Sequence, residues 1–198
     1  MHMKKTLPVL AITVFAGIAV QTSAQPGGYA SSVISYNTGS GFTAGYTNAS
    51  SALGEPSRIT PGQFGGPVDP FSPPYLSEQL VSVGAGGHLT IQLDSPALNH
   101  PANPFGIDFM IFGNNGFVIT NGDFGGGGVT DGSLFGANPG ETIVSVSTDG
   151  TTYYRLTPSL TPVVDGPFPT DGRGDFHKPV NPALNNNSFG GKNLSEIR

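Results

Sequence analysis

The chain has 198 residues, of which 30 are glycine and 18 are proline, and it contains neither cysteine nor tryptophan. Its formal net charge is −5, with only 8 lysine and arginine residues, which excludes the basic surface that proteins use to neutralise nucleic-acid phosphates. The absence of cysteine also excludes a disulfide framework. Glycine and proline are not periodic and alternate with short apolar runs, which indicates a loop-rich folded domain rather than a disordered tail.

The first 24 residues have the pattern of a secretory signal peptide. Lys4 and Lys5 provide the positive region, and Leu7–Val20 is an apolar run of the right length. Small residues precede the predicted cleavage site between Ala24 and Gln25. The run is too short for a lasting membrane span, so the mature chain is expected to have none and to be secreted or held at the cell surface. The alternative is a buried N-terminal helix.

Residues 25–198 predict a single all-β domain, an antiparallel β-sandwich of the jelly-roll type with little helix. Apolar alternation and short apolar runs predict strands over Ser31–Tyr36, Gln79–Gly84, His88–Asp94, Ile107–Phe112, Phe117–Thr120, Thr142–Ser147 and Thr152–Leu156. One helical turn is expected near Ser50–Leu53. The intervening loops are long, and they cover residues 54–75, 95–105, 121–140 and 158–193.

Three of these strands carry specific expectations. His88–Asp94 alternates strictly, so it should have one buried and one wet face. Ile107–Phe112 is almost wholly apolar, so it should be a central strand covered on both faces. Thr142–Ser147 and Thr152–Leu156 flank an Asp149-Gly150 turn and should form an antiparallel hairpin.

Two patterns resemble known proteins. The segment VSVSTDGTTYYRL (144–156) resembles the strand-turn-strand of discoidin-like domains, which are also called F5/8 type C or galactose-binding-like sandwiches. The ordered set SALGEPSR (51–58), VSVGAGGHLTIQLD (81–94) and NPFGIDFMIFGNNGF (103–117), followed by that hairpin, resembles exported or cell-surface proteins of planctomycete-type bacteria. Many of those proteins carry a C-terminal PEP-CTERM sorting tail. The resemblance implies a sandwich fold and an exported location, and it implies no reaction.

The chain ends at Asn193–Arg198 without such a tail, and this last segment is interpreted as the lead-in to a further strand. A C-terminally truncated sandwich that lacks its final strands is therefore one expectation.

Acidic loop residues are the candidate metal ligands. Asp123 and Asp131 flank a glycine-rich loop, and Asp171 and Asp175 lie in a second acidic loop. Carboxylates on flexible loops suit calcium, and galactose-binding-like sandwiches often hold one structural calcium ion. The alternative is that these Asp-Gly pairs only form turns.

Aromatic residues in the loops are the candidate ligand-binding residues, with Phe71, Tyr75, Phe124 and Phe135 as the predicted set. Such side chains stack on sugar faces or anchor a partner surface. The alternative is that they fold inward as apolar plugs beneath the loops. Further loop aromatics are Phe64, Phe105 and Phe168.

No pattern of a catalytic nucleophile or metalloenzyme is present. Asp108 lies inside the most apolar segment, so it should be paired, either with a loop backbone or Arg155, or serve as a ligand or catalytic acid. We therefore expect an exported, non-catalytic protein that binds a glycan or another envelope component. The alternatives are a secreted polysaccharide hydrolase, which would draw its carboxylates from Asp108, Asp123, Asp131 and Glu141, and a fragment of a larger surface protein.

Overall fold

The computed structural model describes residues 9–15, 28–136, 141–156 and 175–197. Strands predominate over helix in this part of the chain, as predicted. The chain forms two compact units, each assembled from separate stretches of sequence. Unit 1 takes its described residues from 1–55, 77–98 and 139–159, and unit 2 takes its own from 56–76, 99–138 and 160–198. The predicted cleavage site Ala24–Gln25, together with Asp171 and Phe168, lies outside the described residues.

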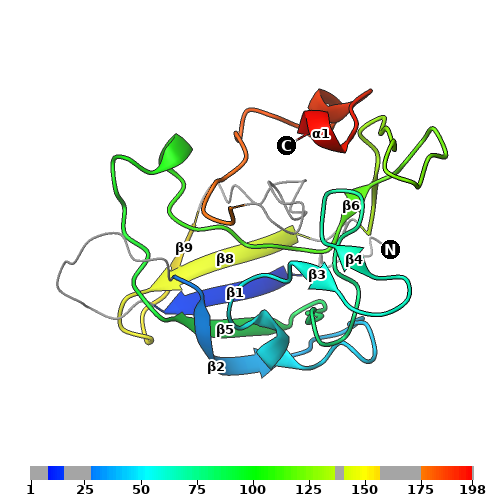
Figure 1. Cartoon of the computed structure of the whole chain (residues 1–198). Helices are drawn as coiled ribbons and strands as arrows, with labels where there is room; N and C mark the ends of the chain where they lie inside the picture. The colour runs from blue at the N-terminus through cyan, green and yellow to red at the C-terminus, as the bar shows by residue number, and fades with distance from the viewer. Residues whose placement is uncertain (1–8, 16–27, 137–140, 157–174, 198) are drawn as a thin grey trace, which may run out of the picture. The chain divides into compact units, whose positions relative to one another are not determined.

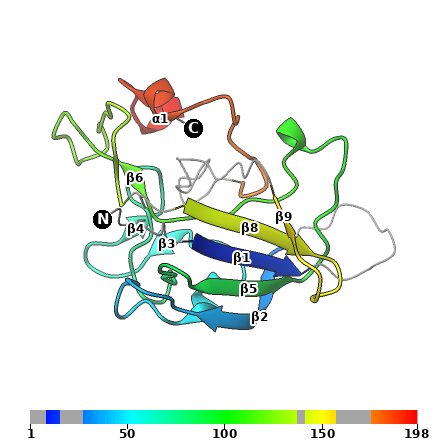
Figure 2. The ribbon, with the colours of Figure 1, turned by 180° about the vertical axis from the view of Figure 1, so that it is seen from behind.

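Unit 1 is built on one five-stranded sheet, in the order β2-β5-β1-β8-β9. Its strands are β1 (Val9–Phe15), β2 (Ala30–Asn37), β5 (His88–Leu93), β8 (Glu141–Ser147) and β9 (Tyr154–Arg155). β1 runs parallel to both of its neighbours, while β2 pairs with β5 and β9 pairs with β8 in antiparallel fashion. The sheet is therefore mixed, and Figures 1 and 2 show β1 at its centre.

The predicted strands β2, β5 and β8 are confirmed, but the wet face expected for β5 is wrong. Leu89 and Thr90 point to opposite faces of the strand, and their exposed fractions are only 5% and 6%. Neither face of β5 is open to solvent at this point.

The predicted hairpin of β8 and β9 is confirmed, and its turn is held by side chains. The Asp149 carboxylate accepts hydrogen bonds from the backbone N–H groups of Thr151 and Thr152, at 2.8 and 2.7 Å. The buried Ser147 hydroxyl accepts from Asp149 N and Gly150 N. The DG sequence thus supplies both the turn conformation and its capping group.

The helical turn expected near Ser50–Leu53 is present as η1 (Ala49–Ala52), which Asn48 caps by accepting from Ser50 N. The strand predicted at Gln79–Gly84 is wrong. That segment instead makes separate backbone hydrogen bonds to the loop before η1. Ser82 N donates to Tyr46 O and Gly84 N donates to Thr38 O, both at 2.7 Å. A side chain on Gly84 would collide with the Ser40 carbonyl, so close backbone contact replaces ladder pairing here.

Unit 2 contains short elements around a small aromatic core. Phe117, Phe189 and Ile197 form its buried cluster, and Phe71, Leu134 and Val180 pack against them. Its pairs are β3 (Ile59–Thr60) with β4 (Gly66–Pro67), and β6 (Gly116–Phe117) with β7 (Leu134–Phe135). Its helical segments are η2 (Pro104–Gly106), η3 (Asn186–Phe189) and α1 (Leu194–Ile197).

Two predicted strands of unit 2 are corrected. Ile107–Phe112 is not a strand, because it forms no ladder with any described residue and packs by side chains instead. Phe112 makes an edge-to-face contact with Phe176, with ring centroids 5.2 Å apart. The predicted strand Phe117–Thr120 is reduced to β6, which ends at Phe117.

The C-terminal segment, interpreted from the sequence as the lead-in to a further strand, is helical within the described residues. Leu194–Ile197 forms one helical turn. Asn193 Oδ1 accepts from Ser195 N and Glu196 N, and Glu196 Oε2 accepts in return from Asn193 N. This reciprocal bonding is the capping-box arrangement, and it brings Ile197 into the core of unit 2.

Across the part of the chain that the structure describes, no helix has the length and apolar character needed to cross a membrane.

Candidate functional site

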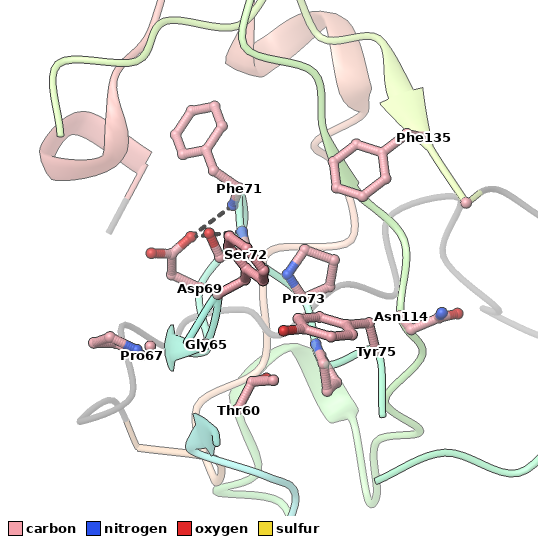
Figure 3. Close-up of a pocket in the computed structure, with 14 residues that line it drawn as sticks. Thr60, Gly65, Pro67, Asp69, Phe71, Ser72, Pro73, Tyr75, Asn114 and Phe135 are labelled. Atoms are coloured by element: carbon pink, nitrogen blue, oxygen red, sulfur yellow. Dashed lines mark hydrogen bonds between the residues drawn. The ribbon is translucent and has the colours of Figure 1, made fainter. Parts of the chain in front are cut away.

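A single face of unit 2 carries a pocket of about 450 Å³, shown in Figure 3. This volume lies within the range of roughly 300–1,000 Å³ that is usual for small-molecule sites. Its lining residues come from the β3–β4 hairpin, the segment that follows it, and the start and end of the β6–β7 region: Thr60, Phe64, Gly65, Gly66, Pro67, Asp69, Phe71, Ser72, Pro73, Pro74, Tyr75, Asn114, Phe135 and Gly136.

The β3–β4 hairpin forms one wall because a glycine lets its two ends approach. A Cβ atom on Gly65 would collide with the carbonyl oxygen of Thr60. Any larger residue at this position would force the loop away from β3. The hairpin also presents Phe64, which is 86% exposed, at the rim.

The turn at Asp69–Ser72 forms the next part of the wall. Asp69 Oδ1 accepts from Phe71 N at 2.7 Å and from Ser72 N at 2.9 Å, as the dashed lines in Figure 3 mark. Asp69 and Ser72 also form an isolated β-bridge. The carboxylate therefore fixes the backbone that leads into Pro73, Pro74 and Tyr75.

Three aromatic side chains of the lining are open to solvent. Phe64, Tyr75 and Phe135 are 86%, 43% and 45% exposed. Phe71 behaves differently: its ring lies 6.3 Å from that of Phe117 in the core, and Figure 3 shows it pointing away from Tyr75. Phe71 thus joins the wall to the core, whereas the other three present ring surface to solvent.

Polar groups in the pocket are few. The carboxylate of Asp69 lies in its wall, and the Oγ1 atom of Thr60 is buried with no hydrogen-bond partner among the described residues. None of the described lining residues is a lysine, arginine or histidine.

Comparison of the chain with protein-family models, with curated proteins and with solved structures finds no match. The assignment of a function therefore depends on the chemistry of the described residues.

Of the four predicted ligand-binding aromatics, Phe71, Tyr75 and Phe135 line this one pocket, although Tyr75 and Phe135 are 60 positions apart in the sequence. Phe124 does not line it. Phe124 is 80% exposed on the 121–129 loop, which Asn121 closes by accepting from Asp123 N and Val129 N. Phe64, one of the further loop aromatics, also lines the pocket.

The carboxylates of the predicted metal ligands Asp123, Asp131 and Asp175 accept hydrogen bonds from residues of their own turns. Asp123 accepts from Gly125 N, Asp131 from Ser133 N, and Asp175 from both His177 N and His177 Nδ1. Hydrogen bonds from Ser133 lower the pKa of Asp131, and those from His177 lower the pKa of Asp175. Within the described ranges, no three acidic or histidine side chains gather as a metal site would require. Asp171 lies outside them.

The carboxylates considered for a hydrolase do not appear in the pocket. Asp108 is exposed and accepts from Asn103 Nδ2 at 2.8 Å, so the expected contact with a loop backbone or Arg155 is replaced by a side-chain amide nearby. Asp123 and Asp131 lie in their own turns, and Glu141 begins β8 in unit 1. The carboxylate in the pocket wall is instead Asp69.

Proposed function

We propose that this chain is an exported bacterial surface or matrix protein that binds a neutral glycan in the pocket of unit 2 and does not cleave it. The observation that carries the proposal is the convergence of three exposed aromatic side chains, Phe64, Tyr75 and Phe135, on one hollow of suitable size. A jelly-roll sandwich related to discoidin-like domains remains our proposal for the complete architecture, and the strand-rich composition supports it.

The aromatic lining favours a sugar because a pyranose ring has an apolar face of C–H groups. The face of an aromatic ring carries partial negative charge, so it attracts these polarised C–H groups while excluding water from them. Tyr75 follows two prolines, and Phe135 pairs with Gly116 in the β6–β7 ladder, so the backbone at both positions is restrained. Rigid aromatic surface costs little conformational entropy on binding.

The charge of the pocket favours a neutral ligand. Asp69 is a carboxylate in the wall, no cationic side chain occurs among the described lining residues, and the whole chain carries a formal charge of −5. A uronic acid or sialic acid would bring a second negative charge close to the Asp69 carboxylate. Hydroxyl groups of a neutral sugar can instead bond to the exposed side chains of Ser72 and Asn114.

Export is supported by the sequence of residues 1–24, and the low charge and the absence of cysteine are compatible with a bacterial exported protein. N-terminal sequencing of the protein secreted by a bacterial host tests this part. We expect the mature chain to begin at Gln25. Retention of the leader on all protein found outside the cell would contradict it.

A glycan array tests the binding function. The chain is compared with the Tyr75→Ala and Phe135→Ala variants, in the presence and absence of calcium. We expect neutral glycans to bind and polyuronates not to bind, and we expect each variant to weaken binding at least about tenfold, which corresponds to ~1.4 kcal/mol.

The matched control is Phe124→Ala, which removes an aromatic ring of similar size that is 80% exposed and lies outside the pocket. This variant should bind as the unaltered chain does. Failure of every neutral glycan to bind, or equal loss of binding in the Phe124 variant, would reject the pocket as a glycan site.

A further inference from the structure

The chain contains two asparagine–glycine steps, Asn115-Gly116 and Asn121-Gly122. An asparagine followed by glycine is prone to deamidation, because the backbone nitrogen of the next residue attacks the side-chain amide and glycine has no side chain to hinder it. The two steps have the same local chemistry, so the sequence does not distinguish them. Their surroundings in the folded chain are opposite.

Asn115-Gly116 is enclosed. Asn115 is 6% exposed, and Gly116 is buried in β6. A Cβ atom on Gly116 would lie 2.8 Å from Cδ of Pro73 and 3.0 Å from Cζ of Phe135. This segment must therefore open before the backbone nitrogen can reach the amide and close the five-membered ring that the reaction forms.

Asn121-Gly122 is open. Both residues are exposed, and a Cβ atom on Gly122 would meet no neighbouring atom within 4 Å. Water therefore has access both to the side-chain amide and to the backbone nitrogen that attacks it.

The hydrogen bonds of Asn121 also favour the reaction. Its Oδ1 atom accepts from the backbone N–H groups of Asp123 and Val129, at 3.3 and 3.1 Å. Attack on Cγ places negative charge on this oxygen, and backbone donors directed at such a charge stabilise it. The Nδ2 atom donates to Gly127 O at 2.9 Å. The loop thus holds the amide with two donors already in place for the charge that develops.

We propose that Asn121 is a site of spontaneous deamidation in the folded chain, and that its conversion opens the 121–129 loop. The nitrogen of Gly122 bonds to Cγ of Asn121, the Cγ–Nδ2 bond breaks, and the Gly122 amide proton leaves with Nδ2 as ammonia. Water then adds to the cyclic imide. Cleavage between Cγ and nitrogen gives aspartate, and cleavage between the backbone carbonyl carbon and nitrogen gives isoaspartate. Water is the one co-reactant, and no atom is oxidised or reduced.

The product cannot close the loop as Asn121 does. An oxygen takes the place of Nδ2 opposite the Gly127 carbonyl, so a hydrogen bond becomes a contact between two acceptors. The new carboxylate also lies two residues from Asp123, whose own carboxylate accepts from Gly125 N in the same loop. Asn121 does not line the pocket, so this site is independent of the proposed glycan binding.

Peptide mapping by mass spectrometry tests the site. The full chain is incubated in mildly alkaline buffer, both folded and in urea, and is then digested at acidic pH. In the folded chain we expect Asn121 to convert at least about tenfold faster than Asn115, which must wait for local opening. In urea the two residues should convert at similar rates, so Asn115 is the matched internal control.

Two variants separate the chemistry from its consequence. Asn121→Gln keeps a side-chain amide, but the longer side chain does not form the five-membered ring, so position 121 should stay unmodified. Asn121→Asp reproduces one of the products. Amide exchange at Val129 should be about fivefold faster in this variant, which is the effect of one lost hydrogen bond.

Conversion of Asn121 in the folded chain at the rate of Asn115 or below would overturn the proposed site. Conversion of position 121 at an undiminished rate in Asn121→Gln would also overturn it, because the mass change would then have another origin. Unchanged amide exchange at Val129 in Asn121→Asp would overturn the proposed opening of the loop.

Discussion

Gly116 faces Phe135 across the β6–β7 pair, and a Cβ atom on Gly116 would lie 3.0 Å from Cζ of Phe135. The same Cβ atom would lie 2.8 Å from Cδ of Pro73. Both neighbours line the pocket. The absence of a side chain at position 116 therefore lets an aromatic ring and a proline ring converge on one wall.

Gly116→Ala is expected to impair the pocket more than the fold. The added methyl group must displace Phe135 or Pro73, because these contacts are closer than side chains tolerate. Overpacking of this kind costs roughly 1–3 kcal/mol of unfolding free energy. Glycan affinity should fall as it does in Phe135→Ala. Unchanged affinity combined with unchanged stability would show that the two rings are free to move apart.

Asp69 is expected to act on the pocket in two ways that can be separated: its side-chain oxygen holds the turn of the wall, and its negative charge affects which ligands bind. Asp69→Asn keeps an oxygen that can accept from Phe71 N and Ser72 N but removes the charge, whereas Asp69→Ala removes both. We expect the alanine variant to lose about 1–2 kcal/mol of unfolding free energy and the asparagine variant to lose little.

On the glycan array, Asp69→Asn should begin to admit acidic sugars while it retains neutral ones, because the like charge in the wall is gone. Continued exclusion of acidic sugars by this variant would show that shape, rather than charge, selects the ligand.

Phe117 is the central residue of the unit 2 core. It is 1% exposed and contacts Phe189 with ring centroids 5.2 Å apart and Phe71 at 6.3 Å. Phe117→Ala should cost about 3–5 kcal/mol in urea unfolding. Because Phe71 joins this core to the pocket wall, glycan binding should weaken as well. The exposed Phe124→Ala serves as the control, with an expected change within about 0.5 kcal/mol.

The turn of the β8–β9 hairpin should make stability depend on pH. Backbone hydrogen bonds from Thr152 and Thr151 hold the pKa of Asp149 far below its usual range in the folded chain, whereas the unfolded value is about 3.9. Because the folded pKa is the lower one, the ionised carboxylate stabilises the fold at every pH above about 4, and this contribution is lost as the pH falls further.

The comparison that isolates the charge is Asp149→Asn, which resembles the protonated acid. The unaltered chain should have the higher melting temperature at pH 7, and the difference should shrink steadily below pH 4. A difference that stays constant between pH 7 and pH 2 would contradict this account.

Local chemistry made several elements predictable from the sequence. Strand alternation identified β2, β5 and β8, and the DG turn identified the β8–β9 hairpin, because each depends on residues within a few positions of one another. Aromatic residues in long loops predicted Phe71, Tyr75, Phe124 and Phe135 as a candidate set, and all of these except Phe124 line the pocket.

Only tertiary structure decided the rest. Ile107–Phe112 is as apolar as a central strand, yet Phe112 packs edge-on against Phe176, a residue 64 positions away, and no ladder partner forms among the described residues. Residues 9–15 could be assigned as a leader from their composition, but their place between β5 and β8 depends on two distant strands with complementary register. The pocket likewise requires Gly116 to allow the close approach of Pro73 and Phe135. Such contacts join segments far apart in sequence, so no local pattern encodes them.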